Sequence, residues 1–217
     1  PYAAEWLLDN FYVIQQAIRQ IREDMPPAYY RQLHRLADSA PAGLPRVYAL
    51  AHDFAVRDLP QGPLDVDAVA QLVEAFQHVA PLTMGEIWAL PVMLRLAAVE
   101  SLVESIGRLT GTLPREGEAG DAADEARVAN AVLSLRALAA EDWKAFFERV
   151  SLVEQALGAD PAGMYGRMEF ETRDRYRKVV EDLARAAGRT EVEVARAAVA
   201  LAAAEAARLG LTVPGDK

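Results

Sequence analysis

The chain has 217 residues, of which 52% are hydrophobic and 25% charged, a composition typical of one large or two small globular domains. It contains no cysteine, which excludes disulfides, iron–sulfur clusters and thiol nucleophiles. The net charge of −9 opposes binding to nucleic acid or anionic lipid, and the longest uncharged apolar run, residues 197–204, is too short for a membrane span. The chain starts at Pro1 without a secretion signal, so we expect it to be part of a longer protein.

Apolar residues recur at helical spacing along nearly the whole chain, and no segment alternates with the period of a strand. The first stripe runs from Leu7 to Met25, and Pro26 and Pro27 end it. The pattern predicts about nine helices, in the ranges 7–25, 27–36, 45–57, 65–79, 83–109, 128–139, 143–158, 176–188 and 190–210. The predicted fold is an all-α array or bundle.

Capping residues mark several of these helix starts. Thr83 and Glu86 have the spacing of a capping box, as do Thr190 and Glu193. Pro91 lies inside the helix that Thr83 opens, where it removes one backbone hydrogen bond and is expected to kink the helix.

A change of composition over residues 110–124, to Gly, Pro, Glu, Asp and Ala, predicts a mobile linker. The predicted division is an N-terminal helical subdomain, 1–109, and a C-terminal one, 125–217, with a single fused domain as the alternative. Ten apolar residues are expected to be largely buried: Leu7, Phe11, Ile14, Ile18, Phe76, Ile87, Leu94, Phe147, Val150 and Leu183.

No residue pattern points to catalysis, a metal or a cofactor. Asp65 and Asp67 match the Asp-x-Asp pair of sugar-nucleotide transferases, but they precede a helix, where carboxylates cap backbone amides. Glu100 and Glu104 lie one turn apart, as an acid/base pair would, although two solvated neighbours are the commoner case. The three histidines, His34, His52 and His78, are isolated from one another in the sequence. Neither a nucleophile elbow nor a phosphate loop occurs in the sequence.

The charged stretch 167–182 is balanced between bases and acids. The spacing predicts three ion pairs on a solvated helix face: Glu169–Arg173, Glu171–Arg175 and Asp174–Lys178. The three tryptophans, Trp6, Trp88 and Trp143, are expected to pack in the core. The alternative for each is stacking on a sugar ring.

Residues 82–95 are the segment where we expect a binding role. Trp88 would be the apolar anchor of a docking surface, with Arg95 and Glu86 as its polar neighbours. The alternative is a bent core helix around a packed Trp88. Substitution separates these readings, because a core tryptophan would affect only folding.

Four blocks of the chain resemble one family. They are residues 4–11 (AEWLLDNF), 79–95 (VAPLTMGEIWALPVMLR), 142–154 (DWKAFFERVSLVE), and 160–165 with 170–176 (DPAGMY and FETRDRY). In this order they resemble the N-terminal cytoplasmic region of bacterial cyclic β-1,2-glucan synthases. The departure is 110–124, where the family has a longer helical stretch.

The resemblance implies a large inner-membrane glycosyltransferase that uses UDP-glucose, makes osmoregulated periplasmic glucan and carries a phosphorylase-like domain. No catalytic residue of that family maps onto this chain. The implied role is a non-catalytic scaffold on the cytoplasmic side of the membrane, whose partners are the transferase and membrane domains of the same polypeptide or a second copy. The alternative is a regulatory module that binds β-1,2-glucan or a nucleotide sugar.

Overall fold

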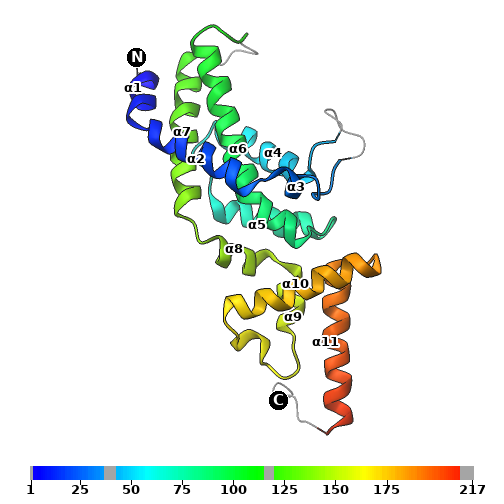
Figure 1. Cartoon of the computed structure of the whole chain (residues 1–217). Helices are drawn as coiled ribbons and strands as arrows, with labels where there is room; N and C mark the ends of the chain where they lie inside the picture. The colour runs from blue at the N-terminus through cyan, green and yellow to red at the C-terminus, as the bar shows by residue number, and fades with distance from the viewer. Residues whose placement is uncertain (1, 37–42, 115–119, 211–217) are drawn as a thin grey trace. The chain divides into compact units, whose positions relative to one another are not determined.

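A computed structural model describes residues 2–36, 43–114 and 120–210, and these residues are helical without any strand, as the all-α prediction requires (Figure 1). One isolated bridge joins Arg35 and Pro45. The described helices are α1 (Tyr2–Asp9), α2 (Phe11–Asp24), α3 (Pro27–Tyr30), α4 (Arg46–Asp58), α5 (Val66–Gln77), α6 (Met84–Leu109), α7 (Asp121–Ala140), α8 (Trp143–Val150), α9 (Leu152–Gly158), α10 (Phe170–Ala187) and α11 (Glu191–Arg208), with a 3-10 turn η1 (Tyr165–Arg167).

Two polar residues divide helices that the apolar pattern predicts as continuous. Asn10 lies between α1 and α2 and donates from Nδ2 to the Trp6 carbonyl at 2.7 Å, which caps the end of α1. Ser151 has extended backbone between α8 and α9, and its Oγ accepts from the Glu154 N–H at 3.2 Å. Short polar side chains compete with the helix for backbone groups, so each converts one expected helix into two.

The chain forms two compact units, and their boundary differs from the predicted one. The first contains Pro1–Ala75 and Gly85–Trp143, and the second contains Phe76–Met84 and Lys144–Lys217. Helix α7 belongs to the first unit, where it packs against α1 and α2, whereas the predicted division assigned it to the C-terminal subdomain 125–217. Of the predicted linker, residues 115–119 lie outside the described residues, and Asp124 is buried within α7, where it accepts from Arg108 Nε at 2.9 Å.

The first unit is built around α6. Its buried cluster comes from α2, α6 and α7, with Trp6 and Leu7 of α1 packed against it: Val13, Ile14, Ala17, Ala98, Leu102, Val128, Ala131, Val132 and Leu135. Helix α6 continues through Pro91 and is buried on most sides, as its near-continuous apolar sequence requires. In the described part of the chain, no helix is both long and apolar enough to cross a bilayer.

The second unit packs α9 against α11 and α10 against α11. Gly188 ends α10 in the left-handed conformation, with φ of 62°, which glycine adopts without a steric penalty. The predicted capping box of Thr190 and Glu193 opens α11, as expected. The segment Phe76–Met84 is held in this unit by Gln77, whose Nε2 donates to the Val150 carbonyl at 2.8 Å, and by the Met84 N–H, which donates to Glu191 at 2.7 Å.

Five of the ten predicted core residues are buried: Ile14, Ile87, Leu94, Phe147 and Val150. Three are half-buried: Leu7, Ile18 and Phe76. The prediction is wrong for Phe11 and Leu183, which are 55% and 54% exposed. The break at Asn10 directs Val13 and Ile14 inward in place of Phe11, whereas α10 turns Val180 and Ala184 inward in place of Leu183.

Candidate functional site

Glu86, one of the three predicted binding residues, lies buried at the start of α6. Arg46, the first residue of α4, holds its carboxylate in two bonds, from Nε at 2.6 Å and from Nη2 at 2.7 Å. The partly exposed His34 places Nδ1 3.4 Å from the same carboxylate. The side chain of Glu86 has no exposed area, so its charge fixes α4 against α6 rather than facing solvent.

Arg95 is also buried, on the same helix. Its Nη2 donates to the Leu138 carbonyl at 3.1 Å, and the Trp143 indole N–H donates to that same oxygen at 3.0 Å. The guanidinium lies 6.0 Å from the centroid of the Trp143 ring. Burial lowers the pKa of Arg95, which Asp24 partly opposes. Arg95 therefore joins α6 to the end of α7.

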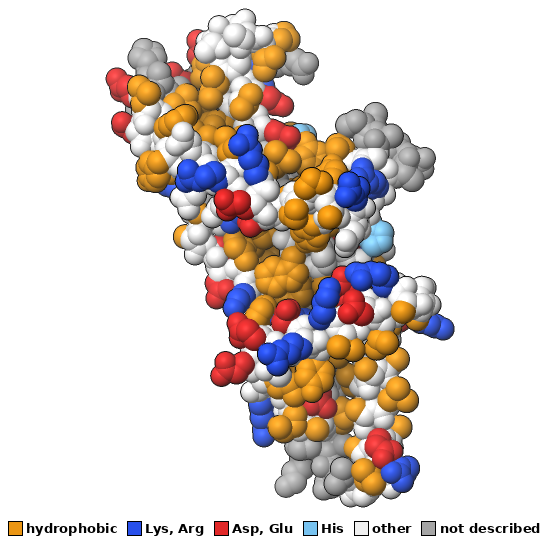
Figure 2. Space-filling view, in the orientation of Figure 1, with side chains coloured by type: hydrophobic (Ala, Val, Ile, Leu, Met, Phe, Trp, Pro, Cys, Tyr) orange, Lys and Arg blue, Asp and Glu red, His pale blue; other side chains and the backbone are white. Residues whose placement is uncertain are grey.

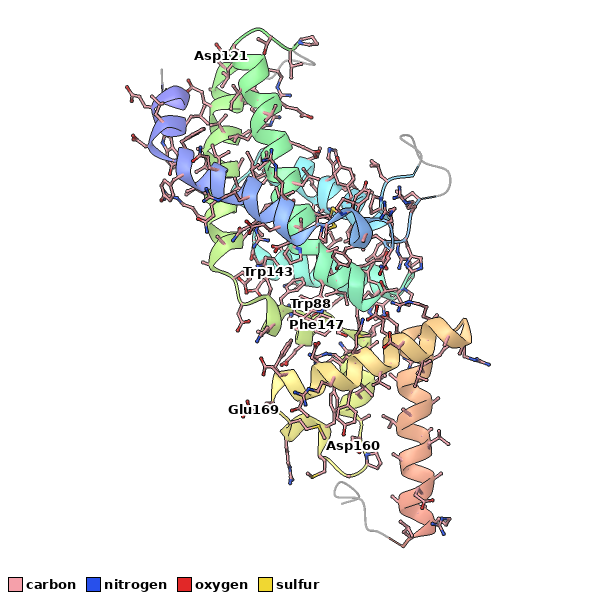
Figure 3. The ribbon with its side chains drawn as sticks, viewed as in Figure 1. Trp88, Asp121, Trp143, Phe147, Asp160 and Glu169 are labelled. Carbon is pink, nitrogen blue, oxygen red and sulfur yellow. The ribbon has the colours of Figure 1, made fainter. Side chains whose placement is uncertain are left out.

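Trp88 is the third predicted binding residue, and its side chain is half-buried (Figure 3). It differs from Glu86 and Arg95 in being only partly buried. The structure thus places the three residues on one helix, and of the three only Trp88 keeps some accessible surface with which to contact another molecule.

The remaining carboxylates from the sequence have structural partners. Asp65 Oδ1 accepts from the Asp67 N–H at 2.9 Å at the start of α5, as the capping prediction expects. Glu100 accepts a hydrogen bond from the Tyr48 hydroxyl at 2.9 Å. Burial is the larger cause and this hydrogen bond the second cause that together raise the pKa of Tyr48 to about 12. Glu104 lies 3.7 Å from Arg108. Within the described ranges, no group of three or more His, Cys, Asp or Glu residues is arranged to hold a metal ion.

A buried charged cluster in the second unit was not predicted from the sequence. Glu154 accepts one bond from Arg173, one from Arg177 Nη1 at 2.7 Å and one from the Tyr165 hydroxyl at 2.6 Å. Arg173 also donates to Glu148. We call Glu148, Glu154, Tyr165, Arg173 and Arg177 the Glu154 cluster. It joins α8, α9, η1 and α10.

These contacts replace the predicted surface ion pairs. Arg173 turns toward Glu154 and not toward Glu169, while Glu171 pairs with Lys144 at 2.9 Å and Lys178 pairs with Glu181 at 3.0 Å. The prediction used spacing along a single helix. For Arg173, the more deeply buried acceptor Glu154 on α9 provides a better-desolvated partner, whereas the pairs of Glu171 and Lys178 remain exposed.

Arg177 is almost fully buried, with only 1% of its surface exposed. Its guanidinium lies 4.5 Å from the Phe170 ring centroid and 5.1 Å from that of Phe147. Burial lowers its pKa, but Glu154 outweighs this effect and the net direction is upward. Burial and then the bond to Glu154 raise the pKa of Tyr165, so its hydroxyl remains a donor at neutral pH. With both carboxylate oxygens of Glu154 occupied, the cluster holds helices together.

Asp160 builds the loop that carries Tyr165 into this cluster. Its carboxylate accepts from the backbone N–H groups of Ala162 at 3.0 Å, Met164 at 2.8 Å and Tyr165 at 3.1 Å. Burial raises the pKa of Asp160, but the three N–H donors outweigh it and lower the pKa below its ordinary value.

We expect Asp160→Ala to reduce the free energy of unfolding most at neutral pH. The folded-state pKa is depressed, so the ionised carboxylate contributes stability above the unfolded pKa of about 3.9 and loses it as the pH falls through the folded value. Urea unfolding of the wild type and the variant, followed from neutral pH to below about pH 3, tests this. A difference between the two proteins that is independent of pH would contradict it.

The chain is related in sequence to one cyclic β-glucan synthase, in agreement with the resemblance of the four sequence blocks. It is 29% identical over 273 residues to the cyclic beta-(1,2)-glucan synthase NdvB of Rhizobium meliloti (strain 1021). The match covers 91% of this chain and 9% of NdvB, so the chain corresponds to a small part of that protein. No protein-family model matches the chain.

The aligned length of 273 residues exceeds the 217 residues of the chain, so NdvB contains residues that have no counterpart here. The resemblance to the family predicts such a shortening at residues 110–124. The last two resemblance blocks, 142–154 and 160–165 with 170–176, contain four of the five members of the Glu154 cluster, and Arg177 follows directly after them. Those blocks therefore marked the region of the cluster, although not the contacts within it.

Proposed function

We propose that this chain is a non-catalytic helical scaffold of a cyclic β-1,2-glucan synthase, a protein that makes glucan from UDP-glucose. The observation that carries the proposal is the match of 91% of the chain to only 9% of NdvB. A segment this small, made of packed helices, fits an accessory part of a large enzyme better than a complete glycosyltransferase.

The chemistry of the charged residues supports a scaffold. Glu86 is held by Arg46, Glu154 by two arginines and Glu100 by Tyr48. These carboxylates are engaged in contacts between helices. General acid/base catalysis instead needs a carboxyl group within reach of a substrate.

The partners in this proposal are the transferase and membrane domains of the same polypeptide, on the cytoplasmic side of the bacterial inner membrane. Trp88 is the proposed anchor, because it is the one of the three predicted binding residues that is not fully buried. A partly exposed aromatic ring supplies apolar contact area at low conformational cost, as at the centres of many protein interfaces.

Calorimetric titration of the purified chain tests the scaffold against the carbohydrate-binding alternative. We expect no binding heat with linear or cyclic β-1,2-glucan or with UDP-glucose, and no turnover of either substrate. Saturable binding of a glucan would favour the regulatory module, and turnover by the chain alone would overturn the non-catalytic proposal.

We expect Trp88→Ala to leave the isolated chain folded while reducing glucan output from the full-length protein at least about tenfold, a loss typical of a binding hot spot of about 1.4 kcal/mol or more. The matched control is Leu90→Ala on the same helix, because Leu90 is only 1% exposed and its loss should lower the melting temperature. Thermal denaturation and a glucan synthesis assay provide the two measurements. If Trp88→Ala destabilises the chain as much as Leu90→Ala, Trp88 is a core residue and the docking proposal fails.

A further inference from the structure

Helix α10 exposes an apolar stripe on the second unit. Tyr176, Val179 and Leu183 are 50%, 55% and 54% exposed, and their spacing of three and four residues aligns them on one face. The helix buries a different face, which carries Arg177, Val180 and Ala184. Figure 2 shows apolar side chains along α10 and α11 in the lower part of the view. This stripe is left over after α10 has packed within its own unit.

Charged residues border the stripe in a self-complementary order. Arg175 and Asp182 are seven residues apart, two helical turns, and therefore lie on the same edge of the stripe. Arg175 is exposed and makes no ion pair with any residue that the structure describes, because Glu171, its expected partner, binds Lys144. Asp182 is 59% exposed and lies 3.3 Å from the equally exposed Arg185. Arg175 and Asp182 thus place a basic and an acidic group at opposite ends of one edge, the acidic group in a solvent-exposed pair with Arg185.

The net negative charge of the chain lies entirely in the first unit. That unit contains 20 acidic and 11 basic residues, a net charge of −9, whereas the second contains 12 of each and is neutral. Two copies meeting through their first units would repel each other, and two meeting through their second units would carry no net charge into the contact. This distinguishes the α10 stripe from another exposed apolar group among the described residues, Leu8, Phe11 and Tyr12, which lies on the acidic unit.

We propose that the α10 stripe binds a second copy of this chain, with the two α10 helices antiparallel about a two-fold axis near Val179. This axis places Tyr176 of each copy opposite Leu183 of the other. The same axis brings the Arg175–Asp182 edge of one copy beside the Arg175–Asp182 edge of the other. Arg175 of each copy therefore meets Asp182 of the other, and this ion pair occurs twice. A parallel arrangement would bring opposite edges together and lose both ion pairs.

Exchanging the two charges tests this arrangement. Sedimentation of the 217-residue chain over a concentration series is expected to show a reversible dimer, which is weak because one helix pair buries less than the roughly 1,600 Å² of a standard interface. Each single variant, Arg175→Asp or Asp182→Arg, places two like-charged pairs across the dimer. Each should therefore raise the dissociation constant by at least about tenfold. The double variant restores opposite charges and should dimerise like the wild type.

Two further variants separate the stripe from general effects of surface charge. Val179→Asp at the proposed axis should abolish the dimer, while Val79→Asp, at a residue of the same unit that is 88% exposed, should leave it unchanged. Circular dichroism should show all variants folded with similar melting temperatures. A wild type that is monomeric throughout, or a double variant no better than the single ones, would overturn the proposal. Because the measurement needs no glucan, its failure is distinguishable from failure of the proposed function.

Discussion

Glu154→Ala is expected to lower the free energy of unfolding of the second unit by about 3 to 5 kcal/mol, the range for breaking a buried ion pair from one side. The variant leaves Arg177 buried without its carboxylate and removes the acceptor of the Tyr165 hydroxyl. Urea unfolding followed by far-ultraviolet circular dichroism is the appropriate measurement, because all three tryptophans lie in the first unit.

The matched control for this variant is Glu181→Ala. Glu181 also accepts from two basic residues, Lys178 and Arg185, but both are mostly exposed to solvent. Exposed ion pairs contribute about 0 to 1 kcal/mol, so the control should be far less destabilised. Equal losses in the two variants would mean that burial of the Glu154 cluster has no energetic consequence.

Leu94→Ala is expected to destabilise the first unit by about 2 to 5 kcal/mol, whereas Leu183→Ala should cost less than about 0.5 kcal/mol. The sequence pattern predicts both leucines as core, but Leu94 has no exposed surface and Leu183 is 54% exposed. Tryptophan fluorescence reports on the unit that contains Leu94, and circular dichroism reports on both. A large loss for Leu183→Ala, measured at a concentration where the chain is monomeric, would show that its side chain is covered within the chain and would contradict the exposed stripe.

Local rules predict much of this fold because they act within a few residues. The Thr190 capping box opens α11 where expected, and the apolar run of α6 becomes the centre of the first unit. The helix breaks at Asn10 and Ser151 were missed because each depends on a single short polar side chain within a continuous apolar stripe.

The site was harder to predict than the helices. Periodicity assigns arginines to the solvent face, so Arg177 gave no indication that it would be buried between Phe147 and Phe170. Glu86 and Arg95 were expected beside Trp88 at a docking surface, and the structure uses both for packing, because Arg46 and the Leu138 carbonyl come from distant parts of the chain. The polar segment 110–124 resembled a linker, although Asp124 is fixed by Arg108.

The segment Phe76–Met84 belongs to the second unit although the chain on both sides of it belongs to the first. The ribosome therefore releases this segment long before Val150 and Glu191, the residues that hold Gln77 and Met84, have been synthesised. Until then Leu82, which is 3% exposed in the finished protein, has no completed unit in which to be buried. No single cut in the gene can separate the two units, and a truncation after Trp143 would leave nine residues of one unit stranded in the other.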